Sequence, residues 1–495
     1  MAERRSNRSL PWVVQGGMGV AVSGWRLASS VARMGQLGVV SGTALAVVLA
    51  RGLQDGDRGG HLRRGLAAFV DRPVAARILE RYFRPSGLAA GGAYRAVPVP
   101  RRRSGRHFLE LTAAASFVEV FLAKEGHDGP VGINLLEKIQ IPTLPSLYGA
   151  MLAGVDWVFM GAGIPRHIPA ALEALADHRP TALPLAVAGA AAEDDLRLTF
   201  DPRSVLPHGG DPLPPPRFAA IVGSHVLAAH LAREEGGCPA AFVVERPVAG
   251  GHNAPPRGAR RLNAAGEPAY GPRDEVNLAR MRQLGVPFWM AGAYADPGRV
   301  CEARREGACG VQVGTAFALC EESGLDPVLK RRTRELAAAG QLVVRTDPAA
   351  SPTGYPFKVA QVPGTLADPE IAAVRERRCD LGYLATPYRK ADGTVGYRCP
   401  AEPVADYVAK GGEVKDTVGR NCLCNGLTAA VGLAQRRHPG AAEPPLLTLG
   451  DDARAVLAAL SPDGRPYRAE DVVRYLLPPS RERPDRASPP PAAAQ

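Results

Sequence analysis

Eight short apolar runs alternate with amphipathic helical segments through about residue 340, and this rhythm constrains the fold more than any other feature. Most of the runs are unbroken, which is typical of parallel strands that are covered by protein on both faces. Strands that alternate with helices in this way indicate repeated βα units. The predicted strands are residues 11–15, 37–41, 131–135, 156–160, 218–223, 241–245, 286–291 and 310–314.

Eight strands with helices between them predict an α/β fold, a closed (β/α)8 TIM barrel with insertions and a C-terminal appendix. An open doubly wound sheet is the alternative. The barrel is expected to span residues 1–340, with insertions at about 62–124 and 183–216. After residue 345 the βα rhythm stops, and a Cys-containing appendix is expected to about residue 437. Residues 478–495 are mostly Pro, Arg, Ser and Ala and are expected to be disordered.

Local signals refine this outline. Asp296 followed by Pro297 is a typical helix start, and Ser224 and Asp274 are expected to cap two further helices. Inside the second insertion, residues 185–188 and 196–200 are expected to pair as a hairpin.

Composition excludes several classes of protein. The chain has 495 residues, of which 46% are apolar and 22% charged, as in ordinary globular proteins. The uncharged stretch 34–50 is shorter than the roughly 18 apolar residues that a spanning helix needs. The N-terminus lacks an apolar signal segment, so a cytoplasmic protein without membrane association is expected. The net charge of +11 comes from scattered arginines without interleaved aromatic residues, so no nucleic-acid partner is expected.

The ends of the last two predicted strands indicate a phosphate site. In a TIM barrel the active site lies at the carboxyl ends of the strands, and phosphates bind after strands seven and eight. Strand seven ends at Gly292 and Ala293, and strand eight ends at Gly314 and Thr315, where a helix is expected to begin. Glycine lets backbone N–H groups approach a phosphate, and a helix start adds unpaired donors. Either loop alone could equally be an ordinary turn, but the pair at these positions favours phosphate binding.

His252 is the candidate catalytic residue. It follows strand six, behind Gly250 and Gly251, at the predicted mouth of the barrel. A lone histidine is usually structural, but an imidazole on this face can act as a base near neutral pH. Asn134, near the end of strand three, could bond the polar edge of a ring.

The order of the motifs QGGMG, VGINLL, VFMGAG, AGGH and GVQVGTAF resembles the nitronate monooxygenase family over about residues 10–340. This resemblance implies a TIM barrel that holds FMN and acts on a small molecule with O2. It implies that Gly292, Gly314 and Thr315 hold the phosphate, and that His252 is the catalytic base. The residues expected to bind the flavin are Gly16, Gly17, Met18, Asn134, Gly161, Glu245, Gly250, Gly251, Gly292, Ala293, Gly314 and Thr315.

The sequence departs from the family pattern at a few positions. A Gln usually stands seven residues before the His and a Glu four before it, where this chain has Glu245 and Val248. The phosphate turn has Ala293 and Tyr294 where a second Gly is commoner. FMN is still the expected cofactor despite these departures. The substrate stays open, because Glu245 would place a carboxylate near the flavin where a neutral amide is usual.

Three functions are compatible with these residues. The leading one is a nitronate monooxygenase that oxidises alkyl nitronates or nitroalkanes with O2. The alternative is an FMN-dependent enoyl reductase acting on carrier-protein or CoA thioesters, with the Arg-rich loop 101–106 docking an acidic carrier protein. A charge run is more often solvated surface, however. The third is a flavin-binding protein with a degenerate site.

Four cysteines of the appendix fall within 46 residues: Cys379, Cys399, Cys422 and Cys424. Four thiols could hold zinc or an iron–sulfur cluster. The spacing lacks the paired CxxC knuckles of common zinc modules, so packing of small apolar thiols is the alternative. A metal site would require the four sulfurs to lie within about 4 Å of one another.

Overall fold

The computed structural model describes residues 10–89, 91–191, 193–234, 237–259, 261–438 and 441–477. The tail predicted at 478–495 lies outside the described residues. Within the described ranges, no helix is long and apolar enough to cross a membrane.

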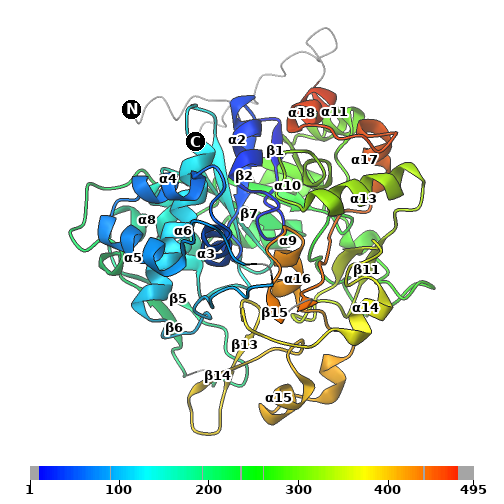
Figure 1. The fold of residues 1–495 in the computed structure, drawn as a ribbon. Helices are drawn as coiled ribbons and strands as arrows, with labels where there is room; N and C mark the ends of the chain where they lie inside the picture. The colour runs from blue at the N-terminus through cyan, green and yellow to red at the C-terminus, as the bar shows by residue number, and fades with distance from the viewer. Residues whose placement is uncertain are drawn as a thin grey trace.

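Eight parallel strands close into a barrel in the order β1-β10-β9-β8-β7-β4-β3-β2 (Figure 1). The TIM-barrel prediction is confirmed, and each predicted strand is present with ends that differ by at most two residues. The strands are β1 Val13–Gln15, β2 Leu37–Ser41, β3 Val131–Leu136, β4 Trp157–Gly161, β7 Arg217–Val222, β8 Ala241–Glu245, β9 Phe288–Ala291 and β10 Gly310–Val313.

The barrel interior is filled by side chains from alternate strand positions, including Val14, Val39, Phe159 and Trp289. These side chains pack on one another inside the barrel, while the opposite strand faces pack on the helices. Both faces are therefore buried, which explains why the strands appear in the sequence as unbroken apolar runs.

The barrel helices surround the strands (Figure 1). Ser224 and Asp296 cap helices as predicted, through side-chain oxygens that accept from Leu227 N and Arg299 N. The expectation for Asp274 is wrong, because it lies in a short 3-10 turn and Asn277 caps the next helix instead. The helices are α2 Trp25–Arg33, α3 Leu45–Gln54, α4 His61–Ala68, α5 Arg72–Tyr82, α6 Arg106–Lys124, α7 Thr143–Leu152, α8 Ile168–Ala176, α9 His225–Leu231, α10 Leu278–Gln283, α11 Pro297–Arg305, α12 Thr315–Ala318 and α13 Pro327–Ala338.

The hairpin of the second insertion forms, but its first strand lies earlier than predicted. β5 Thr181–Pro184 pairs antiparallel with β6 Arg197–Phe200. Residues 185–188 were expected in β5, but Ala188 instead bridges to Tyr388 of the appendix. Pairing with a segment two hundred residues away is not visible in a local pattern.

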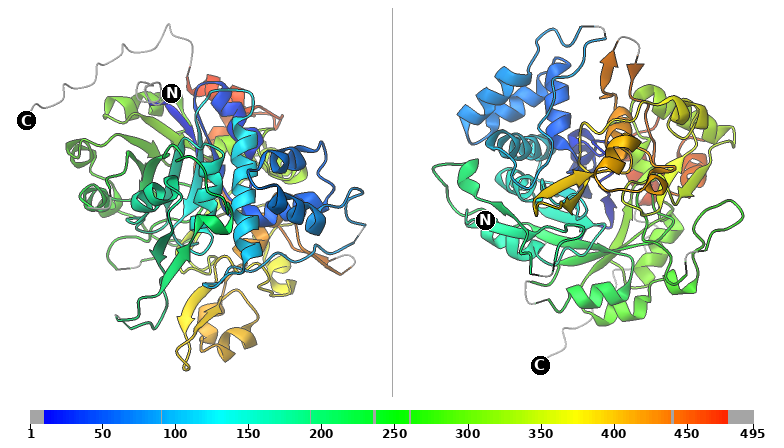
Figure 2. Two further views of the ribbon diagram at one scale, coloured as in Figure 1. Left: turned by 90° about the vertical axis from the view of Figure 1, so that its left-hand side faces the viewer. Right: turned by 90° about the horizontal axis from the view of Figure 1, so that it is seen from below.

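The appendix lies across one end of the barrel (Figure 2, right). After it, the chain returns to the barrel, where α17 packs on α13 and α18 packs on α2. These last two helices were not predicted from the sequence. The C-terminal elements are β11 Val344–Asp347, β12 Phe357–Ala360, α14 Pro369–Val374, β13 Thr386–Arg389, β14 Val395–Arg398, α15 Val404–Ala409, α16 Leu423–Ala429, β15 Arg436–His438, β16 Ala441–Ala442, α17 Ala453–Leu460 and α18 Ala469–Leu476.

Candidate functional site

A cavity of about 460 Å³ opens at the carboxyl ends of the barrel strands, beneath the appendix. This volume falls within the usual range of small-molecule and cofactor sites. His252 and all twelve residues expected to bind the flavin line this cavity. These thirteen residues come from six of the eight barrel strands and the loops after them, which are far apart in the sequence.

The turn after β9 has the backbone shape that a phosphate cradle needs. Gly292 and Ala293 both have left-handed backbone angles, with φ of 93° and 59°. A Cβ on Gly292 would lie 3.1 Å from the Cβ of Arg246 and 3.3 Å from the N of Ala249, so a side chain there would crowd the loop after β8. Ala293 keeps the left-handed conformation where a glycine is commoner, at an energetic cost that is tolerated mainly at functional sites.

The turn after β10 meets a third loop from the C-terminal region. A Cβ on Gly314 would lie 3.3 Å from Met18 Sδ. The hydroxyl of Thr315 accepts a hydrogen bond of 2.9 Å from the backbone N of Gly450, and its proton can still be donated. Thr448, Gly450 and Asp452 line the same cavity and were not predicted from the sequence. The run Thr-Leu-Gly-Asp-Asp at 448–452, a glycine turn before a helix, was the available signal.

On the side of the turn after β1, the cavity wall is made of backbone and amide groups. A Cβ on Gly17 would lie 2.3 Å from the Cβ of Asn134, so backbone and side chain are in close contact there. The Oδ1 atom of Asn134 is buried without a hydrogen-bond partner among the described residues. Gln15 fixes the turn, since its Nε2 donates to Gly16 O and to Ser23 Oγ. An unpaired acceptor beside glycine backbone suits the polar edge of a flat ring, so the residues present fit FMN.

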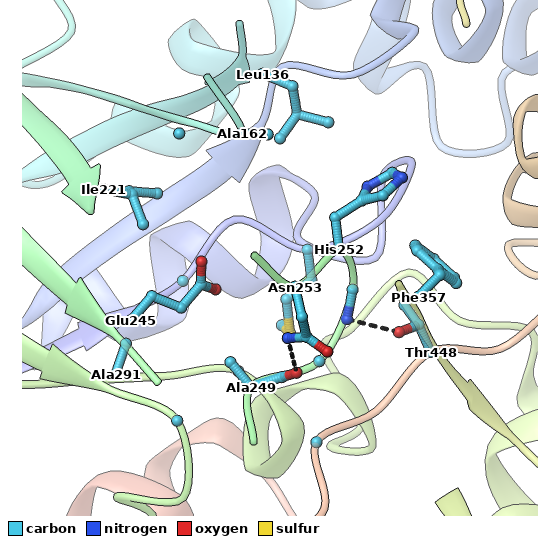
Figure 3. A pocket seen from close by; sticks show the side chains of 18 of the residues that line it. Leu136, Ala162, Ile221, Glu245, Ala249, His252, Asn253, Ala291, Phe357 and Thr448 are labelled. Carbon is cyan, nitrogen blue, oxygen red and sulfur yellow. Dashed lines mark hydrogen bonds between the residues drawn. The ribbon is translucent and has the colours of Figure 1, made fainter. Parts of the chain in front are cut away.

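His252 is held by the appendix (Figure 3). Its Nε2 lies 2.7 Å from Ser351 Oγ, and its ring packs edge-on against Phe357 at 4.8 Å between centroids. The backbone N of Lys358 donates to Gly251 O, which fixes the loop before the histidine. Burial, with Lys138 nearby, lowers the pKa of His252 to about 3. The imidazole is therefore neutral at physiological pH.

Glu245 and Lys138 place opposite charges in the same cavity. Glu245 ends β8, and burial raises the pKa of its carboxyl to about 7 against the opposing effect of Lys138. Burial lowers the pKa of Lys138 to about 8, against the opposing effects of Glu245 and Glu137. The Lys138 Nζ lies 3.2 Å from the ring centroid of Tyr355. Lys138 was not predicted as a site residue from the sequence. Its position just after a predicted barrel strand could have indicated one, because barrel active sites lie at the carboxyl ends of the strands.

The four appendix cysteines gather, but not as a metal site. Cys399 and Cys422 form a small buried cluster against which Cys379 and Cys424 pack. In the part of the chain that the structure describes, no group of three or more His, Cys, Asp or Glu side chains could hold a metal ion. The prediction of zinc or an iron–sulfur cluster is therefore not supported. Burial raises the pKa of the Cys422 thiol to about 11, which fits a protonated packing residue.

Comparison with known proteins supports the family resemblance. Residues 218–351 match the family model of nitronate monooxygenase, which confirms the resemblance over the segment with the AGGH and QVGTAF motifs. The match includes neither the QGGMG turn nor most of the appendix. A search among curated proteins finds no match.

Solved structures with related folds have low identity to this chain. FabK from Thermotoga maritima has 16% identity and a TM-score of 0.43, covering 96% of this chain and 94% of its own. Nitroalkane oxidase from Streptomyces ansochromogenes has 16% identity and a TM-score of 0.44, covering 94% of both chains. The enoyl reductase domain of MlnA from Bacillus amyloliquefaciens has 12% identity and a TM-score of 0.38, covering 74% of this chain and 67% of its own. These values are too low to support an inference about function.

Proposed function

We propose that this chain is an FMN-dependent oxidoreductase that oxidises alkyl nitronates or nitroalkanes with O2. The observation that carries the proposal is the cavity in which two glycine turns, an unpaired amide oxygen and His252 converge. Part of this cavity lies in the segment that matches the nitronate monooxygenase model. When bound, FMN would supply the redox chemistry, and the protein would supply orientation and electrostatics.

The residues of the cavity divide into two groups under this proposal. The turns at 292–293 and 314–315 would bind the phosphate through backbone N–H groups and the Thr315 hydroxyl. Gly16, Gly17 and Asn134 would contact the ring, with Asn134 Oδ1 as a hydrogen-bond acceptor. Both groups lie at the carboxyl ends of the strands, where TIM-barrel enzymes act.

His252 would bind the nitro group or take a proton from the carbon beside it. Its neutral ring favours the binding role, because a neutral imidazole can donate or accept a hydrogen bond without bringing a charge into the cavity. The appendix side chains Tyr383, Leu384 and Leu427 complete the cavity wall. These mostly apolar groups would exclude water and accommodate an alkyl substituent.

The enoyl-reductase alternative gains no specific support from the Arg-rich loop. Arg101 stacks over the ring of Tyr397 at 4.6 Å, and Arg106 pairs with Glu110 at 2.7 Å. These side chains are engaged within the chain. Docking of an acidic carrier protein stays a prediction.

The test is an absorption spectrum of the FMN-reconstituted protein, followed by two parallel assays. We expect bound flavin, and aerobic turnover of small alkyl nitronates. Bleaching of the flavin by NADPH and reduction of an enoyl thioester, without nitronate turnover, would favour the reductase. A protein that retains no FMN would contradict both functions.

A further inference from the structure

We propose that Glu245 takes the proton from the carbon of a neutral nitroalkane and that Lys138 stabilises the nitronate anion so formed. This inference rests on the proposed function and deepens it, because it names the residues that would let the chain accept the un-ionised substrate.

Glu245 presents a free carboxylate to the cavity. Figure 3 shows its side chain directed into the cavity, between Ile221 of β7 and Ala291 of β9. Among the described residues, no group donates a hydrogen bond to this carboxylate and no cation pairs with it within 4.0 Å. The side chains that flank it on the neighbouring strands, Ile221 and Ala291, are uncharged, and Lys138 is the charged group that acts on it. The guanidinium Nη2 of the next residue, Arg246, lies 3.7 Å from Glu275 Oε1 and pairs with that carboxylate, not with Glu245.

Lys138 is positioned without an ion-pair partner among the residues described. The π face of Tyr355 holds its ammonium group, and Lys138 lines the same cavity as Glu245. A cation that is not already paired can stabilise an anion that forms beside it, and this effect is stronger in a partly buried site than in water. The loop after β3 thus supplies the counter-charge.

The protonation chemistry of the two candidate bases differs in a way that favours Glu245. A general base works best when its pKa lies near the working pH. Burial raises the pKa of Glu245 to about 7, so the carboxylate is both available and more basic than an exposed one. Burial lowers the pKa of His252 to about 3, which makes its ring a weak proton acceptor. His252 is then left to bind the nitro group.

The step is balanced without an oxidant. The C–H bond beside the nitro group breaks, and its proton forms an O–H bond with the Glu245 carboxylate. The electron pair of the C–H bond moves into the nitro group and gives the nitronate. One negative charge passes from Glu245 to the substrate, and the Lys138 ammonium offsets it there. The nitronate is then the substrate of the oxidation proposed above.

The test compares E245Q and H252N with the wild-type holoenzyme on nitroethane and on ethyl nitronate that has been ionised beforehand. E245Q should lose about 100-fold in kcat/KM on nitroethane but stay within about threefold on the nitronate, because only nitroethane needs proton abstraction. H252N should lose activity on both substrates. E137Q is the matched control, since Glu137 also acts on Lys138 but does not line the cavity. The ratio of kcat/KM on nitroethane to kcat/KM on ethyl nitronate should be the same in E137Q as in the wild type.

A second readout is independent of turnover. Infrared difference spectra, wild-type minus E245Q holoenzyme, should show a carboxylic-acid band that disappears as pH rises through about 7. The subtraction removes the band of Glu119, whose pKa is also raised to about 7. If the wild type oxidises nitronate but E245Q matches it on nitroethane, the assignment of Glu245 is overturned while the proposed function stands. If the wild type acts on neither substrate, the proposed function fails and the assignment falls with it.

Discussion

The hydrogen bond between His252 and Ser351 joins residues about one hundred positions apart at the mouth of the barrel. Removing the hydroxyl in S351A should free the imidazole to rotate and misplace a bound substrate, while the flavin contacts stay intact. We expect a loss of about tenfold in kcat/KM on alkyl nitronates, because small losses of orientation are costly in rate. Flavin content, measured by absorption, should be unchanged.

The control for this variant is S104A, because Ser104 lies on a surface loop and does not line the cavity. This variant should keep wild-type kinetics. Equal activity of S351A and wild type would show that the hydrogen bond does not orient the ring.

Gly314 should be intolerant of a side chain. In G314V the added atoms would approach Met18 Sδ, which a Cβ alone would meet at 3.3 Å, and would occupy the space assigned to the phosphate. We expect the purified variant to retain less than about a tenth of the wild-type FMN, because the backbone could no longer approach the phosphate. G105A is the control, since Gly105 has φ of −69° and no atom within 4 Å of an added Cβ. Normal flavin content in G314V would show that the phosphate site is misplaced.

At the residue scale, the sequence predicted the cavity well where a motif follows a strand. His252 and the twelve predicted flavin-binding residues all line one cavity, because strand ends in a parallel barrel converge on one face. Ser351, Thr448 and Asp452 were missed for a physical reason. They belong to no βα unit, and only the return of the appendix over the barrel brings them to the site.

At the scale of elements, α6 and α2 are joined by a buried carboxyl. Glu119 of α6 accepts a hydrogen bond of 2.9 Å from the backbone N of Trp25 at the start of α2. Burial raises the pKa of Glu119 from 4.5 to about 7. The folded state therefore binds this proton more tightly than the unfolded state. Between these two values the free energy of unfolding should fall as pH rises, and above about 7 this contribution should level off.

E119Q cannot ionise and should lose this pH dependence. Relative to wild type, the variant should gain about 2 kcal/mol in free energy of unfolding between pH 5 and pH 8. Urea unfolding curves of both proteins at the two pH values measure the difference. A difference that is constant with pH would mean that Glu119 titrates normally in the folded protein.

The sequence predicted the barrel elements because each buried strand is a local apolar run. The sequence-based prediction was wrong where strand pairing depends on contacts far along the chain, and where another residue caps the helix. β5 ends at Pro184 and does not extend to residue 188, because Ala188 pairs with Tyr388 of the appendix instead. Asp274 does not begin a helix because its carboxylate accepts hydrogen bonds from the backbone N–H groups of Arg257 and Gly271. The four cysteines lie together, as a metal site would require, but among the described residues they form no metal site and pack as apolar side chains.

For the whole molecule, the barrel and the C-terminal helices share one hydrophobic core. The same cluster of buried residues includes Val13 of β1 and Leu476 of α18. The Tyr467 hydroxyl donates to Ala316 O at 2.6 Å and connects the last helices to α12. The appendix and the helices that follow it are therefore part of the structural unit that forms the cavity.

A chain truncated after residue 344 should consequently fail to fold as a stable barrel, because it would expose the apolar surface that α17 and α18 cover. A chain truncated after residue 477 keeps every described element and should fold with its flavin. Circular dichroism and flavin content of both proteins check this. A folded, FMN-binding fragment of residues 1–344 would contradict it.

Under the proposed function, FMN bound in the cavity accepts electrons from a nitronate. The most direct measurement is an anaerobic titration of the FMN-reconstituted protein with ethyl nitronate, followed by the visible absorption of the bound flavin. We expect nitronate to bleach this absorption without NADPH, and the absorption to return when O2 is admitted. A protein that retains no flavin, or a bound flavin that nitronate leaves unbleached, would contradict the proposed function.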